Sequence, residues 1–354
     1  MTYTIVQPET QDVRDEVLAL WERNLPTAAG GRYDWLYENG PAVGWMVRDE
    51  KGAAIGSMGM MGRTIKVFNK VCAGGQPIDL NIDKRHRMGG PAMQLQRSLT
   101  EAVDSGRLVL SYGLPNTQAE PVLRRAGYRE LGTMGRWTKP LDTCNLIGER
   151  LKNRLLRKAT ANVVNTGLWL TSTETWRRRR EGVHAEIVDR FDERFDRLWE
   201  AARDKYNIIG ERSAEYLQWR FANCPDVRYR TLSLCDENDR LLAYLTYSQE
   251  KGRAYVGDLL FVEDRDLELL LSEFIWSLRR HRRESVTMIF HGHPFIAKTL
   301  RKFGFYHRPS QWKVMVYVNE AELATAADPT DPDASLARVM SEENWFLTRA
   351  DIDT

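Results

Sequence analysis

A short run of small and basic residues, Arg87-Met88-Gly89-Gly90-Pro91-Ala92, has the composition of a phosphate-binding loop. It follows a segment, 78–83, whose apolar and polar residues alternate as in a half-buried strand, and it precedes a predicted amphipathic helix at 92–103. A helix that begins here offers unpaired backbone N–H groups and the positive end of its dipole, and small residues let a phosphate approach the main chain. Pro91 suits the first helical turn, and Arg87 can add charge-assisted hydrogen bonds. The same residues also fit an ordinary Gly-Gly turn, so both interpretations stay open.

Three landmarks recur in the same order along the chain, which predicts a duplicated domain. The three pairs are Leu20-Trp21-Glu22 with Leu198-Trp199-Glu200, Trp35–Pro41 with Trp219–Pro225, and Leu123–Tyr128 with Leu300–Phe305. The loop has no such counterpart, because the corresponding region, 264–269, contains no glycine. This difference predicts one working ligand site in the first copy and another use for the second.

The composition excludes several classes of protein. A chain of 354 residues is long enough for two ordinary domains, and its formal net charge of +2 argues against a protein that binds DNA over its whole surface. Its four cysteines, Cys72, Cys144, Cys224 and Cys235, include no Cys-x-x-Cys pair, which favours reduced thiols over a zinc knuckle or a disulfide framework. The first residues lack the pattern of a signal peptide, and no stretch is apolar enough to span a bilayer. These features predict a cytoplasmic protein.

The repeats predict a division of the chain into four parts. These are a first domain with the loop (1–141), a basic linker or helical insertion (142–182), a second, degenerate domain (183–320) and a C-terminal tail (321–354). The tail is rich in Ala, Asp and Pro around 324–335, so we expect it to be flexible, although Trp345 and Phe346 suggest that its last residues dock on the body.

The segment 142–182 is basic at both ends and more apolar in the middle. Its basic residues gather at 150–158 and at 177–180, on either side of the apolar residues 163–170. The pattern favours a solvated linker with one or two helices. The alternative is that residues 150–180 contact anionic lipid or RNA.

The loop pattern resembles the pyrophosphate-binding motif of the GNAT acyltransferases, Arg/Gln-x-x-Gly-x-Gly/Ala, which also lies between a strand and a helix. The family's later motif, Asn-x-x-Ala before a helix that ends in Gly-aromatic, is similar to Asn116-Thr117-Gln118-Ala119 and Gly127-Tyr128. The resemblance covers residues 1–140 well and 183–318 in outline. It implies an α/β (α+β) fold of two tandem GNAT-like domains, each a splayed mixed β-sheet flanked by helices.

The resemblance also implies that acetyl-CoA, or another acyl-CoA, is a co-substrate held in a V-shaped cleft of the first domain. The main chain of the strand at 80–83 would pair with the pantetheine arm, the loop at 87–92 would hold the pyrophosphate, and Asn116 would lie near the thiol. The implied cofactor-binding residues are Leu80, Asn81, Ile82, Arg87, Met88, Gly89, Gly90, Pro91, Ala92 and Asn116. No metal is expected, because the pair His291 and His293 lacks a third ligand at a useful spacing.

Catalytic candidates follow from the chemistry of acyl transfer to an amine, which must lose a proton to a base such as a carboxylate. Asp79 and Asp83 lie on one face of the predicted strand, although Asp83 could equally cap the loop. Tyr112 and Ser111, on the next predicted strand, are alternatives. Many GNAT proteins carry a Tyr four residues after the Ala as proton donor to the thiolate. This chain has Leu123 there, so a proton must come from elsewhere or is not needed.

The aromatic residues Tyr33, Trp35 and Tyr37 could line an acceptor pocket. Because Trp219 and Phe221 repeat the pattern in the copy without the loop, a packing role is favoured.

We therefore expect an N-acyltransferase that moves an acetyl or similar acyl group from acyl-CoA to an amine on a small molecule, an amino sugar or a peptide. One alternative is a Fem-type transferase that uses aminoacyl-tRNA, because tandem GNAT folds resemble that class. The other is a non-catalytic acyl-CoA sensor or scaffold of a polysaccharide or envelope pathway, which Leu123 supports.

Overall fold

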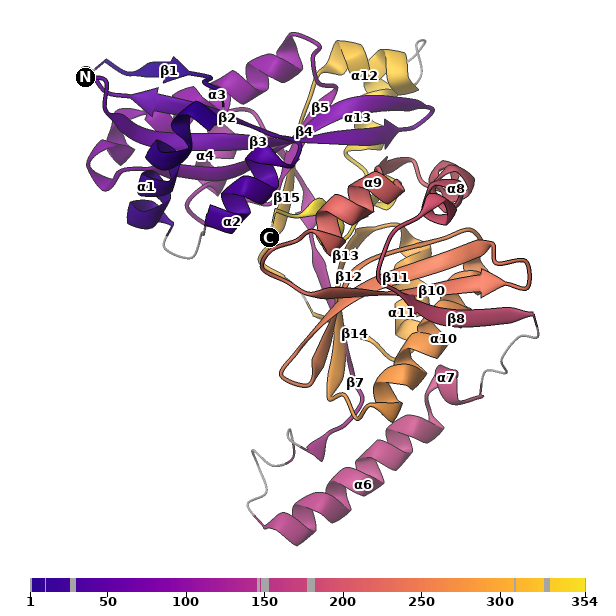
Figure 1. Cartoon of the computed structure of the whole chain (residues 1–354). Coiled ribbons are helices and arrows are strands. Elements are labelled where there is room, and N and C mark those ends of the chain that lie inside the picture. Colours follow the sequence, from indigo (N-terminus) through magenta and orange to yellow (C-terminus); the bar gives the residue numbers. More distant parts are fainter. Residues whose placement is uncertain are drawn as a thin grey trace.

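The chain folds into two halves whose strands follow the same order (Figure 1). The computed structural model describes residues 2–9, 11–25, 30–144, 147, 153–176, 182–308, 310–327 and 332–353. The first half has the order β1-β2-β3-β4-β5-β15-β6, and the second has β8-β10-β11-β12-β13-β7-β14. Within each half only one neighbouring pair is parallel, β4 with β5 and β12 with β13. The predicted fold class, mixed sheets flanked by helices, is confirmed.

The strands of the first half are β1 (Thr4–Val6), β2 (Ala42–Arg48), β3 (Ala54–Val67), β4 (Lys70–Ile82), β5 (Leu110–Gly113) and β6 (Arg129–Thr133). Those of the second half are β8 (Val183–Val188), β10 (Tyr229–Asp236), β11 (Leu241–Glu250), β12 (Arg253–Phe261), β13 (Ser285–Gly292) and β14 (Tyr306–Arg308). The predicted strand at 78–83 is the end of β4.

The two halves exchange one strand each. Strand β7 (Gly135–Pro140) leaves the first half and pairs with β13 and β14, while β15 (Lys313–Val318) leaves the second half and pairs with β5 and β6. The division of the sequence at residue 141 stays a prediction. Strand β7 precedes this boundary in the sequence but pairs in the second half, and β15 follows it but pairs in the first half.

Helices cover both faces of the first sheet. Met46 packs in the cluster of α1 (Arg14–Asn24), while its neighbours Trp45 and Val47 pack in the cluster of α3 (Pro91–Asp104). Apolar residues at helical spacing bury one face of α3, which confirms the helix predicted at 92–103. The other helices of the first half are α2 (Gly30–Tyr33) and α4 (Glu120–Arg125), and those of the second are α8 (Glu193–Ala202), α9 (Ala214–Leu217), α10 (Asp264–Arg280) and α11 (Pro294–Lys302).

The repeated Trp segments meet at the centre of the molecule. Each forms a π-helical turn, η2 (Asp34–Glu38) and η5 (Gln218–Ala222). The rings of Trp35 and Trp219 stack with centroids 4.9 Å apart, and each indole N–H donates to the other tryptophan's carbonyl at 2.9 Å. This reciprocal pair agrees with the packing role predicted for Trp35.

The C-terminal residues that the structure describes are built into the body, whereas the sequence analysis expected a flexible tail at 321–354. They form α12 (Glu320–Ala327), α13 (Pro332–Val339), β16 (Trp345–Leu347) and the short helix η7 (Arg349–Asp351). Strand β16 pairs with β13 and with β9 (Ile208–Gly210), which itself pairs with β3, so this segment joins the two sheets. Trp345 and Phe346 are buried, as the sequence suggested.

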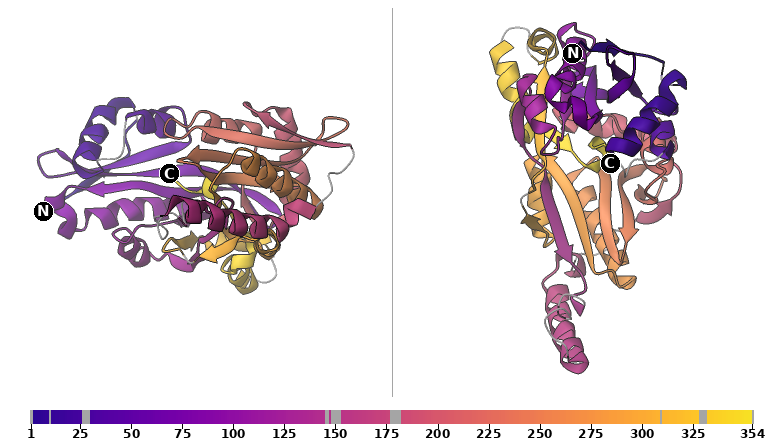
Figure 2. Two further views of the ribbon diagram at one scale, coloured as in Figure 1. Left: turned by 90° about the horizontal axis from the view of Figure 1, so that it is seen from below. Right: turned by 90° about the vertical axis from the view of Figure 1, so that its left-hand side faces the viewer.

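The insertion between the repeats contains α6 (Arg154–Leu170) and α7 (Thr173–Trp176). Figure 1 and the right-hand view of Figure 2 show α6 extending away from the sheets. Among the described residues, no helix combines the length and the apolar character needed to cross a bilayer.

Candidate functional site

Strands β4 and β5 open like a V and leave one edge of β4 without a partner among the described strands. Their pairing ends at Gly75 and Ser111, whereas β4 stays paired with β3 as far as Ile82. A cavity of 480 Å³ lies in the opening, large enough for part of a small-molecule ligand. Its walls come mainly from β4, the end of β5, α3 and α4, and the second half and the C-terminal segment contribute one carboxylate each. The lining residues are Leu25, Arg32, Pro77, Ile78, Asp79, Leu80, Gln96, Gly113, Leu114, Pro115, Asn116, Ala119, Leu123, Asp226 and Asp353.

Asp79 is aimed by a bulge in β4. The register against β3 shifts at this point, and Asp79 adopts a φ of +53°, which is rare for a residue with a side chain. Its carboxylate accepts hydrogen bonds from Arg32 Nη2 at 3.0 Å and from the hydroxyl of Tyr37 at 3.0 Å. Burial and the nearby Asp79 raise the pKa of Tyr37 well above its usual value, so Tyr37 remains a donor. A Cβ on Gly59 would lie 2.0 Å from that hydroxyl, so the arrangement requires glycine there.

Asp353 brings a second carboxylate to the same place from the far end of the chain. Its Oδ2 lies 3.8 Å from Arg32 Nη2, and 27% of its side chain is exposed. Burial, and then the negative charge of Asp79, raise its pKa to about 7, although Arg32 acts in the opposite direction. The sequence analysis missed Asp353, Arg32 and Gln96. The burial suggested for Trp345 and Phe346 was the one signal that could have drawn attention to Asp353.

Three catalytic candidates, Asp83, Tyr112 and Ser111, lie outside the cavity. Asp83 accepts hydrogen bonds from Arg23 and Asn24; burial alone would raise its pKa, but these bonds outweigh that effect and lower it. Tyr112 is fully buried against Trp345 in the core, and burial raises its pKa. Ser111 is also buried and accepts a hydrogen bond from Tyr128. Of the sequence candidates for catalysis, Asp79 alone lines the cavity.

The loop between β4 and α3 has the predicted strand–loop–helix setting. Residues Lys84–Gly89 form a 3₁₀ turn, η3, and Gly90 has a φ of +89° at the N-terminal end of α3. In the part of the chain that the structure describes, no side chain caps this end of the helix, and a Cβ on Gly90 would meet no atom within 4 Å. The Arg87 side chain is exposed and donates from Nε to the carbonyl of Ile82 at 3.0 Å, while Met88 is exposed and Pro91 is buried. The start of α3 is thus open to a ligand.

Farther along α3, Gln96 reaches the cavity from the interior. It is fully buried, its Nε2 donates to Tyr128, and its Oε1 has no hydrogen-bond partner among the described residues. A buried amide oxygen without a donor is costly unless a ligand or water supplies one. Because Gln96 is also among the residues that line the cavity, it is a candidate contact for an amide N–H of a bound molecule.

The other predicted cofactor residues differ in position. Leu80 and Asn116 line the cavity, as does Leu123. The Asn116 side chain accepts from the N–H groups of Gln118 and Ala119 and so holds the turn before α4. Asn81 and Ile82 are buried beside β3 and in the core, so their main chains alone could serve a ligand.

No protein-family model matches the sequence, and no curated protein matches it. Solved structures share its architecture. A conserved protein of unknown function from Enterococcus faecalis V583, described as a probable N-acyltransferase, has a TM-score of 0.66 and 12% identity over 90% of this chain and 72% of its own. A GCN5-related N-acetyltransferase (GNAT) from Anabaena variabilis ATCC 29413 has a TM-score of 0.65 and 15% identity over 92% and 75%. The chain has the GNAT fold. Saccharomyces cerevisiae N-myristoyltransferase, solved with bound myristoyl-CoA, matches with a TM-score of 0.53 and 10% identity over 90% and 78%.

The second half of this GNAT fold has the same opening, but the chain's own C-terminal segment occupies it. Strands β12 and β13 pair only as far as Val256 and Met288. Beyond that point β16 pairs with the end of β13, and Thr348 donates to Asp258 on β12 at 2.6 Å. A fully buried ion-pair cluster completes the packing, because Arg212 bridges Asp258 and Asp351. The segment that fills this opening also carries Asp353 to the other one.

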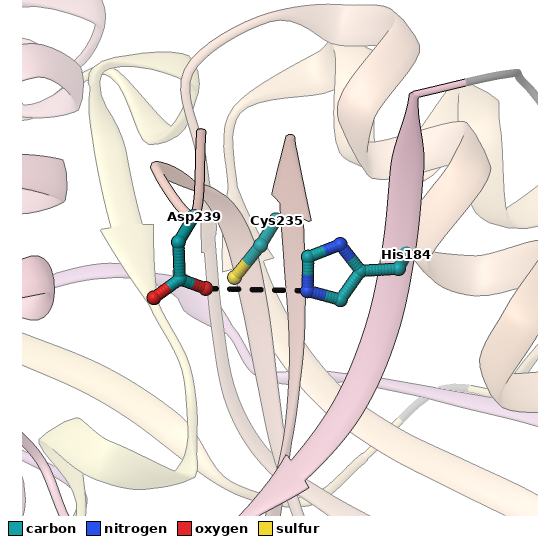
Figure 3. A group of neighbouring side chains, drawn as sticks. All are labelled: His184, Cys235 and Asp239. Carbon is teal, nitrogen blue, oxygen red and sulfur yellow. Dashed lines mark ion pairs between the residues drawn. The ribbon is translucent and has the colours of Figure 1, made fainter. Parts of the chain in front are cut away.

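A separate group on the second sheet, His184, Cys235 and Asp239, has the spacing of metal ligands (Figure 3). The guanidinium of Arg194 already lies 3.1 Å from Asp239 and 3.9 Å from Cys235 Sγ. Burial raises the pKa of the Cys235 thiol to about 11, which disfavours the thiolate that a metal needs. The group therefore fits an arginine-centred cluster better than a metal site. His291 is buried, with Nδ1 3.0 Å from the carbonyl of Thr133.

Proposed function

We propose that the chain is an acyl-CoA-dependent N-acyltransferase whose co-substrate lies in the opening between β4 and β5. The observation that carries this proposal is the free edge of β4 beside the unpartnered Gln96 Oε1, since an extended arm with amide groups could pair with both. The uncapped start of α3 at Gly90 and the exposed Arg87 suit the phosphates at the other end of such a molecule.

The charge of the cavity favours an amine as acceptor. Three carboxylates, Asp79, Asp226 and Asp353, line the cavity together with one guanidinium, Arg32. An ammonium group is attracted to such a site, and Asp226 comes from the second half, so the acceptor would enter between the halves. A small molecule, an amino sugar and a peptide all remain suitable carriers of the amine.

Asp353 is the base that these contacts favour. The acceptor's ammonium must lose a proton before its nitrogen attacks the thioester carbonyl, where a C–N bond forms as the C–S bond breaks. Both oxygens of Asp79 already accept hydrogen bonds, whereas Asp353 makes a longer contact with Arg32 and has a pKa near neutrality. Asp79 and Arg32 then act as positioning residues for Asp353.

Among the described residues that line the cavity there is no tyrosine to protonate the departing thiolate, and Leu123 takes the position of the GNAT tyrosine. A thiol is acidic enough to leave as the anion and to take its proton from water. The proposal therefore assigns no acid to this chain.

Calorimetry with acetyl-CoA tests the proposal. Arg87→Glu should weaken binding by about ten- to a hundredfold, because it replaces a charge-assisted contact with repulsion. Arg265→Glu is the matched control, since Arg265 is exposed at the start of α10, the counterpart of α3. Equal effects of the two changes, or no binding by the unaltered protein, would refute the assignment. Binding without thiol release over a broad amine panel would instead support a non-catalytic acyl-CoA sensor.

A further inference from the structure

Helix α6 carries an apolar stripe that no described part of the protein covers. Leu155, Leu156, Ala159, Val163 and Leu170 fall within about a third of the helix circumference. All five are exposed, Leu155 to 80% and Val163 to 73%. Scattered apolar residues on a surface are ordinary, but a continuous stripe along a projecting helix indicates an interaction surface.

The body of the protein holds α6 so that this stripe faces outward. The opposite side of the helix carries the residues with the least exposure, Ala161, Asn165 and Leu168. Asn165 accepts hydrogen bonds from the backbone and hydroxyl of Thr143 and donates to Asp142 at 3.0 Å. The stripe is therefore on the side of α6 away from Asp142 and Thr143, and the helix itself lies at one end of the molecule in Figure 1.

A second anchor fixes the C-terminal end of α6. Ser172 accepts from Lys139 and from Arg279. Glu174 is buried and paired with the same two cations. Just beyond, the exposed ring of Trp176 donates its indole N–H to the carbonyl of Leu170. The end of the stripe thus carries an aromatic ring of the kind found at membrane–water interfaces.

The sequence around the stripe is strongly basic. Residues 150–180 contain nine Lys and Arg residues and one acidic residue, Glu174, whose charge is already compensated. The whole chain carries a formal net charge of only +2, so positive charge is concentrated here. Two copies of such a segment would repel each other, whereas an anionic surface would attract it.

We propose that α6 docks the protein on the surface of a bilayer that contains anionic lipid, with the apolar stripe in the headgroup region. An apolar face on a helix within a strongly basic segment is the pattern of helices that lie in this interface. A nucleic acid would account for the charge but leave the aliphatic stripe without a partner. This inference is independent of acyl transfer.

Sedimentation of the full chain with vesicles tests the inference. The protein should pellet at low salt with vesicles of phosphatidylcholine and phosphatidylglycerol in equal parts, much less with phosphatidylcholine alone, and less as salt rises. The double variant Leu156→Gln with Val163→Gln should lower the partition coefficient by at least about tenfold. The control, Thr160→Gln with Asn162→Gln, alters exposed polar positions of the same helix without a change in charge and should behave like the unaltered protein.

Three results would overturn the inference. One is absence of vesicle binding at low salt, and another is equal binding by the stripe variant and its control. The third is a different partner: a gel shift with tRNA that the stripe variant retains, or a dimer in analytical ultracentrifugation that the stripe variant dissociates. Because the altered side chains point to solvent, unchanged thermal unfolding should show that both variants are folded.

Discussion

Replacing Asp353 by Asn should remove a base whose ionisation sets the rise of activity with pH. The pKa of about 7 lies roughly 3 units above that of a free Asp, which corresponds to about 4 kcal/mol between the two protonation states. That figure is an upper bound, because 27% of the side chain remains in contact with solvent. The ionised carboxylate is thus a stronger base than an ordinary aspartate, and it is present above about pH 7.

The assay compares kcat/KM of the unaltered protein and the Asp353→Asn variant between about pH 5 and pH 9. This range extends about two pH units on either side of the pKa. Their ratio cancels the titration of the acceptor amine. It should rise with pH, pass half of its maximum near pH 7, level off above that, and reach about 10²- to 10⁴-fold in favour of Asp353. A ratio that is close to one, or that does not change with pH, would refute the role of Asp353 as base.

The same carboxylate links pH to the docking of the last residues. A raised pKa in the folded state means that Asp353 contributes stability at pH values below its unfolded pKa of about 4, and that this contribution is lost as pH rises through about 7. Removing Arg32 with Arg32→Gln should raise the apparent pKa, whereas Asp79→Asn should lower it. Shifts in the same direction for both variants would contradict the charge arrangement.

Four further substitutions test the supports of the site. Gly59→Ala should displace the Tyr37 hydroxyl and lower kcat/KM by about tenfold or more, and Tyr37→Phe should reproduce this loss with a smaller fall in Tm; full activity in both would contradict the role of Tyr37 in orienting Asp79. Gly90→Ala should lower the free energy of unfolding by about 1–2 kcal/mol in chemical denaturation, because Gly90 has a φ of +89°. It should also weaken acetyl-CoA binding. An unchanged denaturation midpoint would show that the left-handed turn is not needed. Asp351→Asn should destabilise by about 3–5 kcal/mol, because it leaves the buried Arg212 without one of its two anions, and a change of less than about 1 kcal/mol would mean that the cluster is dispensable.

Local patterns predicted the parts of the fold that depend on neighbouring residues. The alternation before Asp83 and the apolar spacing after Pro91 predicted the end of β4 and α3, because each pattern reflects burial on one side of a single element. The resemblance of the loop to the GNAT motif then predicted the opening of the sheet beside it.

The exchange of β7 and β15 could not be predicted in this way. Each strand could pair with the corresponding sheet edge of either half. Contacts between residues distant in sequence therefore decide the half in which it pairs. Asp353 was missed for the same reason, since its position depends on β16 pairing with β13. Asp79 was recognised, but the bulge that aims it follows from packing against β3.

The most direct test of the account is the structure of the chain with acetyl-CoA bound. We predict that the pantetheine arm follows the free edge of β4 past Gln96, with its phosphates at Gly90 and its thioester within reach of Asp353. Acetyl-CoA seated between β12 and β13, with the C-terminal segment displaced, would contradict the central claim. So would an empty first opening at saturating ligand.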